Sequence, residues 1–235
     1  MEEKIFLTIR EQAAIAAMQG MLANNFDYES VEVMAEKAVK CADALVKELN
    51  REGELETCSN HTVTQLESLS DGIYVVYEDG KHELFNGKNC TENVSHIGIK
   101  LGHLSLGLKL NSFDDCTLPE TNHDIYITSY DKAIQDWNGK ENTQRLKDVG
   151  LDIKLLEDEW LPSLGEYIFI FCHSEALNEA LAYLGGDKLV NDWYWSSTEY
   201  DSNKAWPVYS TMFDGWFTES DWKYGSCLAR AVCAF

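Results

Sequence analysis

The spacing of apolar residues predicts two helices at the start of the chain. Alanine and methionine residues crowd positions 13–22, a composition that favours a first helix. Between Val31 and Leu49 the apolar residues recur every three or four positions, which is the spacing of a single helical stripe. Two helices with a short connection form an antiparallel hairpin, which we assign to residues 1–57.

The apolar stripe of this hairpin needs a covering surface. We favour self-association, which would make the hairpin an oligomerisation element, over packing on the rest of the chain. The residues expected at the contact are Val31, Ala35, Ala38, Ala42, Leu45 and Leu49.

Strand-like patterns follow the hairpin. Residues 51–65 lack periodicity and are expected to form a linker, whereas 72–77 is a run of β-branched and aromatic residues. A turn signal and a second short run lie within 78–85, so the two runs predict a β-hairpin. Further β-like sequence at 97–110 completes a β-rich bridging segment, which we assign to residues 58–120.

Helical periodicity returns in the second half of the chain. Residues 128–148 and 163–184 alternate polar and apolar positions as two amphipathic helices do. Ser163 and Glu166 have the spacing of a capping box at the start of the second helix. The Gly-Gly pair at 185–186 supplies the residue type that commonly ends a helix. The expected class is α+β.

The last 45 residues differ from the rest in their aromatic content. Twelve of the residues from 191 to 235 are Phe, Trp or Tyr, including five of the seven tryptophans. Ser, Thr, Asn, Asp and Gly stand between the rings, which is the composition of antibody-type binding surfaces. A tryptophan-rich β core would have a similar composition, so composition alone leaves both interpretations open.

Several motifs in this region resemble one known family. They are WLPSLGE at 160–166, LNEAL at 177–181, LGG at 184–186, WYWSSTEY at 193–200, AW at 205–206 and RAVCAF at 230–235. In type and order they resemble the variable proteins of diversity-generating retroelements, which occur in bacteria and their phages. The resemblance implies a C-type-lectin-like domain, related in fold to the formylglycine-generating enzyme. We assign that domain to residues 121–235, preceded by the helical hairpin.

The same resemblance divides the C-terminal region into constant and variable positions. In such proteins an invariant scaffold displays residues that adenine-directed mutagenesis recodes. The scaffold positions that match are Trp195, Ser196, Ser197, Thr198, Glu199, Ala205, Trp206, Gly215, Arg230 and Phe235. The exposed, ligand-binding positions would be Asp201, Ser202, Asn203, Lys204, Pro207, Tyr209, Thr211, Phe213, Trp216, Thr218, Ser220, Asp221, Trp222, Tyr224, Gly225 and Ser226.

Charge and composition narrow the classes of partner. The formal net charge of -21 repels phosphate backbones and anionic lipids, so nucleic acid is not an expected partner. No stretch matches the apolar part of a signal peptide or of a membrane span, so we expect neither a signal peptide nor membrane insertion. The seven cysteines are scattered without a Cys-x-x-Cys pair, so we expect reduced, mostly buried thiols and no metal site.

The sequence shows no arrangement of catalytic residues. It contains no Gly-x-Ser-x-Gly elbow and no His-Glu-x-x-His helix, so we expect a binding protein without a cofactor and not an enzyme. The expected ligand is a protein or glycan receptor on a host or neighbouring cell, with the chain an adhesin on the virion surface if a phage encodes it. Two alternatives stay open: an enzyme of the formylglycine-generating type that uses Cys227 or Cys233, and a structural assembly subunit with a buried aromatic tail.

Overall fold

The computed structural model describes Ala14 and residues 31–49, 69–210 and 216–235. The predicted first helix, apart from Ala14, and the predicted linker lie outside these residues, as do Thr211, Phe213 and Gly215. The described elements combine helices with a mainly antiparallel sheet, which confirms the α+β class.

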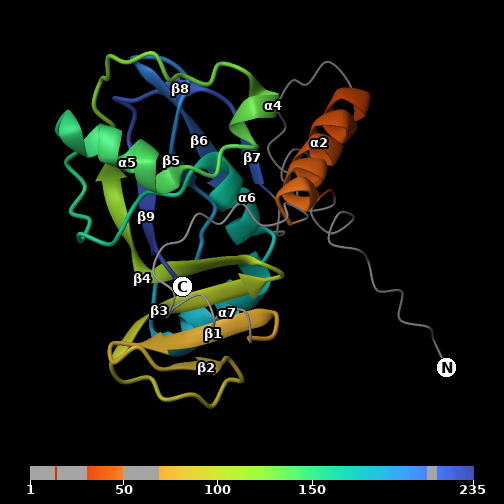
Figure 1. Ribbon diagram of the computed structural model, residues 1–235, viewed down its shortest axis with the longest axis vertical. Helices are drawn as coiled ribbons and strands as arrows, with labels where there is room; N and C mark the ends of the chain where they lie inside the picture. The colour runs from red at the N-terminus through yellow and green to blue at the C-terminus, as the bar shows by residue number, and fades with distance from the viewer. Residues whose placement is uncertain (1–13, 15–30, 50–68, 211–215) are drawn as a thin grey trace.

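One sheet of nine strands runs through the described residues (Figure 1). Its order is β2-β1-β3-β4-β9-β5-β6-β7, and β8 pairs with β6. Neighbouring strands are antiparallel except for β5 and β9, which are parallel. The strands are β1 (Gly72–Tyr77), β2 (His82–Leu84), β3 (Val94–Leu101), β4 (Leu104–Cys116), β5 (Trp193–Glu199), β6 (Lys204–Ser210), β7 (Trp216–Thr218), β8 (Asp221–Trp222) and β9 (Cys227–Cys233).

The last strand, β9, lies in the middle of this sheet between β4 and β5. Its Arg230 is fully buried and donates hydrogen bonds to the carbonyl oxygens of Lys109 (2.9 Å), Leu110 (2.6 Å) and Asp187 (2.6 Å). The sheet therefore runs across the domain boundary that the sequence predicts at residue 120. Local patterns miss this pairing because Lys109 and Arg230 are 121 positions apart in the chain.

The first of the two long helices predicted in the second half is two shorter helices. They are α4 (Tyr130–Ala133) and α5 (Gly139–Asp148). Asp136 interrupts the helix because its carboxylate accepts hydrogen bonds from the backbone N–H of Asn138 (3.1 Å) and the side-chain amide of Asn142 (2.7 Å). Asp and Asn side chains compete in this way with helical backbone bonding.

The second predicted helix is also divided, into α6 (Leu164–Phe171) and α7 (Ser174–Leu184). Its predicted start is confirmed, because Ser163 and Glu166 form both bonds of a capping box. Its predicted end is confirmed as well. Gly185 follows α7 with a φ of 74°, a left-handed conformation that glycine adopts at little cost.

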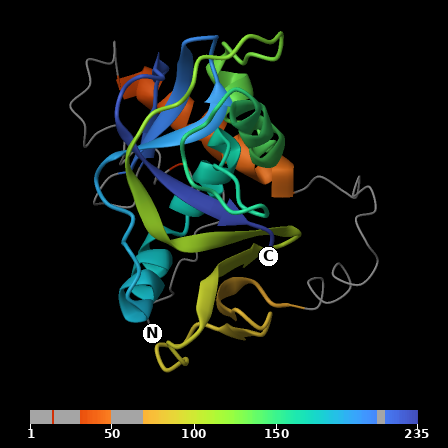
Figure 2. The same cartoon turned by 90° about the vertical axis from the view of Figure 1, so that its left-hand side faces the viewer.

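The N-terminal helix α2 (Val31–Leu49) packs on the rest of the chain (Figures 1 and 2). Its buried residues Ala38, Ala42 and Leu45 belong to the same core cluster as α6, which α2 contacts. Both views place α2 in the half of the molecule away from β1 and β2. Three of the six residues expected at a self-association contact, Ala38, Ala42 and Leu45, are therefore covered within one chain. Self-association of the helix stays a prediction.

Two apolar clusters hold the C-terminal strands. The larger one surrounds α6, whose residues are all buried and which contacts α2, β5 and β6. The smaller one includes Trp195, which is fully buried and donates a hydrogen bond from its indole nitrogen to the Cys116 carbonyl oxygen (2.9 Å). The strands β5 and β6, and β8 paired with β6, therefore lie on a packed core, which can hold a surface site in a fixed position.

Candidate functional site

The predicted ligand-binding residues gather at the two ends of β6. At one end Lys204 pairs with Trp222 of β8, which lies at the top of Figure 1. At the other end Ser210 pairs with Trp216 of β7. A strand rises about 3.4 Å per residue, so the two ends are roughly 20 Å apart. The predicted surface is therefore divided into two patches.

An aromatic ledge, which consists of Trp222, Tyr224 and Lys204, forms the first patch. Trp222 is 44% exposed and Tyr224 is 74% exposed. Their rings stack with centroids 5.7 Å apart and planes at 23°. Lys204 Nζ lies 4.7 Å from the Trp222 ring centroid, a cation–π distance. Rings that are this exposed and already ordered provide rigid contact area for a partner.

A buried ion pair supports the ledge from inside. Lys223 stands between the two exposed rings in sequence, yet its side chain is only 1% exposed and pairs with Glu199, which is 2% exposed. Lys223 Nζ also donates hydrogen bonds to Thr121 Oγ1 (2.9 Å) and to the Ser202 carbonyl oxygen (3.1 Å). These partners satisfy the ammonium, which would otherwise be costly to bury.

His123 completes this network on the other oxygen of Glu199. Its Nε2 lies 2.6 Å from Glu199 Oε2, and its ring stacks on Tyr126 with centroids 4.3 Å apart. The backbone N–H of Ile125 donates to His123 Nδ1 (3.1 Å), so in the neutral ring the hydrogen is on Nε2 and points to Glu199. The network thus joins β5, the turn after β8 and the 117–127 segment into one support.

The loop between β5 and β6 is held by its own side chains. Asp201 Oδ1 accepts hydrogen bonds from the backbone N–H groups of Asn203 (2.8 Å) and Lys204 (2.7 Å). The Asn203 side-chain amide donates to Glu120 (2.8 Å), and Ser202 Oγ donates to Asn203 Oδ1 (2.5 Å). Because these bonds fix the loop before a ligand arrives, little ordering is required on binding.

The rim of the ledge carries the other predicted residues of the first patch. Asp221 and Ser226 are exposed, while Ser220 and Gly225 are half-buried. The Ser226 hydroxyl donates to Asp115 Oδ1 (3.0 Å), so the turn before β9 is tied to the end of β4. Small polar groups therefore surround the two rings, in the mixture that the sequence predicts.

The structure corrects two of the predicted exposed positions. Pro207 is buried because it lies opposite Trp195 in the β5–β6 ladder. Thr218 is 6% exposed, and its hydroxyl donates to the Pro207 carbonyl oxygen (2.5 Å). Both side chains face the protein interior, so neither can contact a ligand on the surface.

The second patch is described only in part. Tyr209 is half-buried, and its ring contacts Trp193 (centroids 5.3 Å apart) and Phe217 (5.5 Å). Thr211 and Phe213 lie outside the described residues, and of Trp216 the structure describes the backbone alone. Tyr209 is therefore the one predicted ligand-binding side chain of this patch whose packing the structure describes.

Sequence reasoning missed the residues that support the ledge. Thr121, His123 and Lys223 were not candidates, although all three contact Glu199. Lys223 lies in the turn after β8, where no strand alternation predicts that its side chain is buried. No local signal exists for His123, which is 76 positions from Glu199 in the chain.

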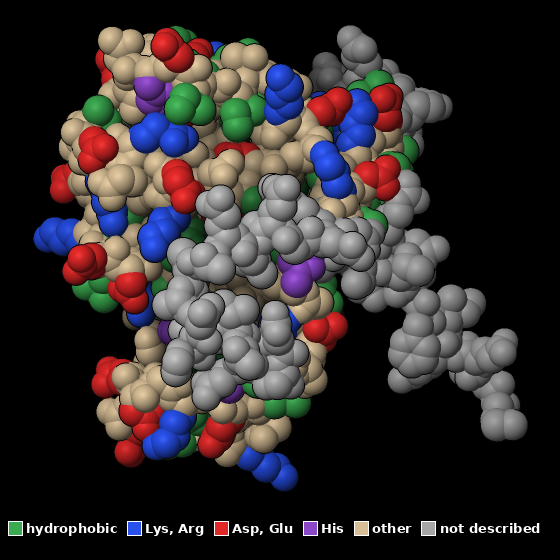
Figure 3. Space-filling model, in the orientation of Figure 1, with side chains coloured by type: hydrophobic (Ala, Val, Ile, Leu, Met, Phe, Trp, Pro, Cys, Tyr) green, Lys and Arg blue, Asp and Glu red, His purple; other side chains and the backbone are tan. Residues whose placement is uncertain are grey.

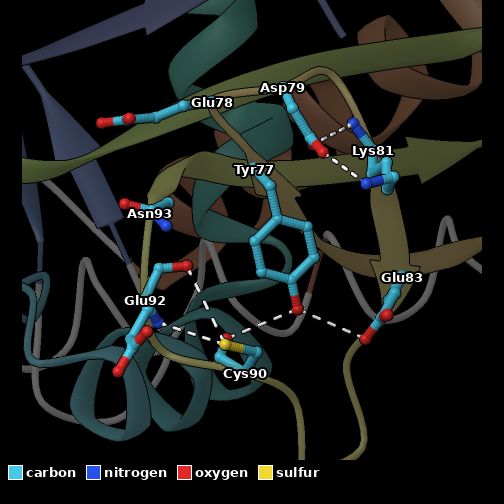
Figure 4. A pocket seen from close by; sticks show the side chains of 8 residues that line it. All are labelled: Tyr77, Glu78, Asp79, Lys81, Glu83, Cys90, Glu92 and Asn93. Carbon is cyan, nitrogen blue, oxygen red and sulfur yellow. Dashed lines mark hydrogen bonds and ion pairs between the residues drawn. The ribbon is translucent and has the colours of Figure 1, made fainter.

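A hollow of about 450 Å³ lies at the opposite end of the sheet, beside β1 and β2 (Figure 4). The Tyr77 hydroxyl points into it and donates to Glu83 (3.3 Å) and to the Cys90 carbonyl oxygen (3.4 Å). Acidic side chains line much of the rest, and Lys81 pairs with Asp79 (2.5 Å). Among the described residues that line it there is no histidine to act as a base for the Cys90 thiol.

Acidic and basic side chains are interspersed over the described surface on the face in Figure 3. None of the described helices is long and apolar enough to span a bilayer. Within the same residues, no group of three or more His, Cys, Asp and Glu side chains is placed to hold a metal ion.

Comparison with known proteins yields a similarity of fold. No family model matches the chain, and no curated protein matches it. The crystal structure of a fimbrial protein from Bacteroides ovatus is similar, with a TM-score of 0.56 and 14% sequence identity. The match covers 71% of this chain and 49% of the fimbrial protein, so the chain spans about half the length of that protein. At this identity the likeness is one of fold alone: the chain shares the fold of part of a fimbrial protein.

Proposed function

We propose that this protein binds a ligand at a cell or virion surface, and that the ligand contacts the aromatic ledge of Trp222, Tyr224 and Lys204. The observation that carries the proposal is the stacked, exposed ring pair above the buried pair of Lys223 and Glu199. Rings on a rigid support lose little entropy on contact, so they dominate affinity in many interfaces. The fold shared with a fimbrial protein is consistent with a surface location.

We further propose a C-type-lectin-like domain of the kind that diversity-generating retroelements recode. Four matching scaffold positions, Trp195, Ser196, Ser197 and Thr198, are fully buried in β5. The described variable positions, apart from Pro207 and Thr218, are exposed or half-buried. Burial of constant residues and exposure of recoded ones is what a scaffold with a variable surface requires, because a core cannot tolerate frequent changes of volume.

The proposed role is binding and not catalysis. Burial raises the pKa of the Cys227 thiol and of the Cys233 thiol to about 12, so both are protonated at neutral pH. An enzyme of the formylglycine-generating type would need one of them as a reactive thiolate. The exposure of Trp222 and Tyr224 argues against the other alternative, an assembly subunit with a fully buried aromatic tail.

The proposed ligand is a protein or glycan receptor on a host or neighbouring cell. The net charge of -21 disfavours nucleic acid and anionic lipid surfaces. Aromatic rings flanked by Asp, Ser and Asn side chains suit either a sugar face or a protein side chain, since both offer C–H groups and hydrogen-bond partners.

Replacement of both ledge rings tests the proposal. Trp222→Ala with Tyr224→Ala should leave the melting temperature nearly unchanged, and should reduce binding of labelled protein to host cells or to a glycan array at least about tenfold. A matched control is Val149→Ala with Leu156→Ala, which removes two side chains exposed to 47% and 62% outside the ledge. Undiminished binding by the ledge variant, or an equal loss in the control, would contradict the proposal.

A further inference from the structure

Two cysteines face each other across the central pairing of the sheet. Cys116 ends β4, Cys227 begins β9, and the two residues are direct partners at the end of the antiparallel ladder, after a register shift between Phe113 and Cys116. Directly opposed residues in such a ladder have Cα atoms about 4.5 to 5.5 Å apart, and a disulfide requires about 4.4 to 6.8 Å. We infer that Cys116 and Cys227 form a disulfide when the chain folds in an oxidising compartment.

The surroundings of the pair favour this bond. Both side chains are buried in the cluster that contains Trp195, whose indole N–H binds the Cys116 carbonyl oxygen (2.9 Å). The neighbouring residues are linked as well, because Ser226 Oγ donates to Asp115 Oδ1 (3.0 Å). The two backbones are therefore already held together. Forming the bond requires the Cys116 side chain to rotate away from the Asp114 carbonyl oxygen, to which its thiol donates (3.5 Å).

The remaining described cysteines, Cys41, Cys90, Cys172 and Cys233, lack such a partner in the sheet. Cys233 is opposite Gly107 in the same ladder, and Cys90 is exposed in the loop after β2. Cys41 lies in helix α2, and its Sγ contacts the Tyr130 hydroxyl (2.9 Å). Within the described strands, the β4–β9 ladder alone places two cysteines directly opposite each other.

Oxidation precedes the closing of the two strands. Burial raises the pKa of Cys116 to about 11 and of Cys227 to about 12, so the folded protein holds almost no thiolate at neutral pH. In the open chain one thiolate attacks oxidised glutathione and releases one glutathione thiolate. The second cysteine thiolate then attacks the mixed disulfide and releases the second, so one S–S bond forms as the oxidant's S–S bond is reduced to two thiols. Burial afterwards shields the bond from reducing thiolates.

The disulfide would restrict the motion of the turn between β8 and β9, which contains Tyr224 of the aromatic ledge. The turn from Tyr224 to Cys227 leads directly into the bond, and Leu118, two residues after Cys116, donates its backbone N–H to the Lys223 carbonyl oxygen (2.8 Å). Fixing both segments lowers the entropy lost when a ligand contacts Tyr224. This consequence rests on the proposed binding function, whereas the bond itself does not.

Thiol counting after refolding tests the inference. The parent is the full chain with Cys58→Ser and Cys90→Ser, which retains five of the seven cysteines. It is refolded with reduced and oxidised glutathione and then alkylated with a maleimide in denaturant. Mass spectrometry of the intact protein gives the number of labelled cysteines. We expect three labelled cysteines and, after digestion without reductant, a peptide that joins Cys116 to Cys227. Dithiothreitol should lower the urea midpoint of this protein.

The matched control is Cys116→Ser in the same parent. It should carry four labelled cysteines, and dithiothreitol should leave its urea midpoint unchanged. Five labelled cysteines in the refolded parent, or a cross-link between another pair, would overturn the inference. Because the count needs no ligand, its failure leaves the ledge proposal intact, and loss of ledge binding leaves the count unaffected.

Discussion

Replacement of Lys223 with methionine tests whether the buried ion pair supports the ledge. Methionine fills most of the same space but lacks the charge and the bonds to Glu199, Thr121 and Ser202. Glu199 is 2% exposed, so water cannot replace the lost ammonium. Its carboxylate is left in the interior with Thr121 (2.5 Å) and His123 (2.6 Å) as its remaining donors.

The size of the loss follows from these contacts. Removal of one partner of a buried ion pair costs about 3 to 5 kcal/mol. We expect Lys223→Met to lower the free energy of unfolding by about 3 kcal/mol, because two donors to Glu199 remain. Glu199→Gln should cost a similar amount, since it leaves the Lys223 ammonium buried without a counter-charge. The double variant lacks both charges, so its loss should be smaller than the sum of the two single losses by about 1 to 3 kcal/mol.

Urea denaturation of the four proteins measures these free energies, with tryptophan fluorescence and circular dichroism as two independent probes. Repeating the series in 1 M salt separates a buried pair from a surface pair, because salt screens exposed charges and has little effect on Lys223 and Glu199. Additive single losses, or a loss below 1 kcal/mol for Lys223→Met, would refute the reasoning, since those are the values of an exposed pair.

Two further predictions concern the core. Burial raises the pKa of Glu166 to about 8 from an ordinary 4.5, so the folded protein keeps a proton that the unfolded chain releases. The free energy of unfolding should therefore fall as the pH rises from about 4.5 to about 8, and Glu166→Gln should flatten that slope in urea titrations at several pH values. Trp195→Ala, which removes a fully buried ring, should cost about 3 to 5 kcal/mol, whereas Tyr224→Ala should cost less than about 0.5 kcal/mol; equal melting temperatures for the two variants would contradict this.

The parts of the fold that sequence reasoning found are those with local signals. The run at β1 and the turn after it follow from residues that are neighbours in the chain, as do the cap at Ser163 and the stop at Gly185. Sequence reasoning missed the break at Asp136 because no glycine or proline causes it. The cause is the Asp136 side chain, which accepts hydrogen bonds from later residues. Packing of α2 on the rest of the chain was the less favoured alternative, because α6, which α2 contacts, lies far along the chain.

The candidate site divides in the same way. An alternation of rings with small polar residues predicted Trp222 and Tyr224 at the surface, and both are exposed. Pro207 and Thr218 lie in the same alternation but are buried, because strand pairing sets which face is covered. The Lys223–Glu199 pair required the fold itself, since Glu199 ends β5 and Lys223 lies in the turn after β8, 24 positions later.

The central place of β9 has a consequence for synthesis of the protein. Its partner β4 ends at Cys116, and β9 begins at Cys227. At about 5 to 20 residues per second, a ribosome needs roughly 5 to 20 s to make the chain between them. During that interval the backbone groups along one edge of β4 have no strand to bond with, and an open edge of this kind pairs readily with other chains. Nascent chains of this protein should therefore aggregate or require a chaperone until residue 233 has emerged.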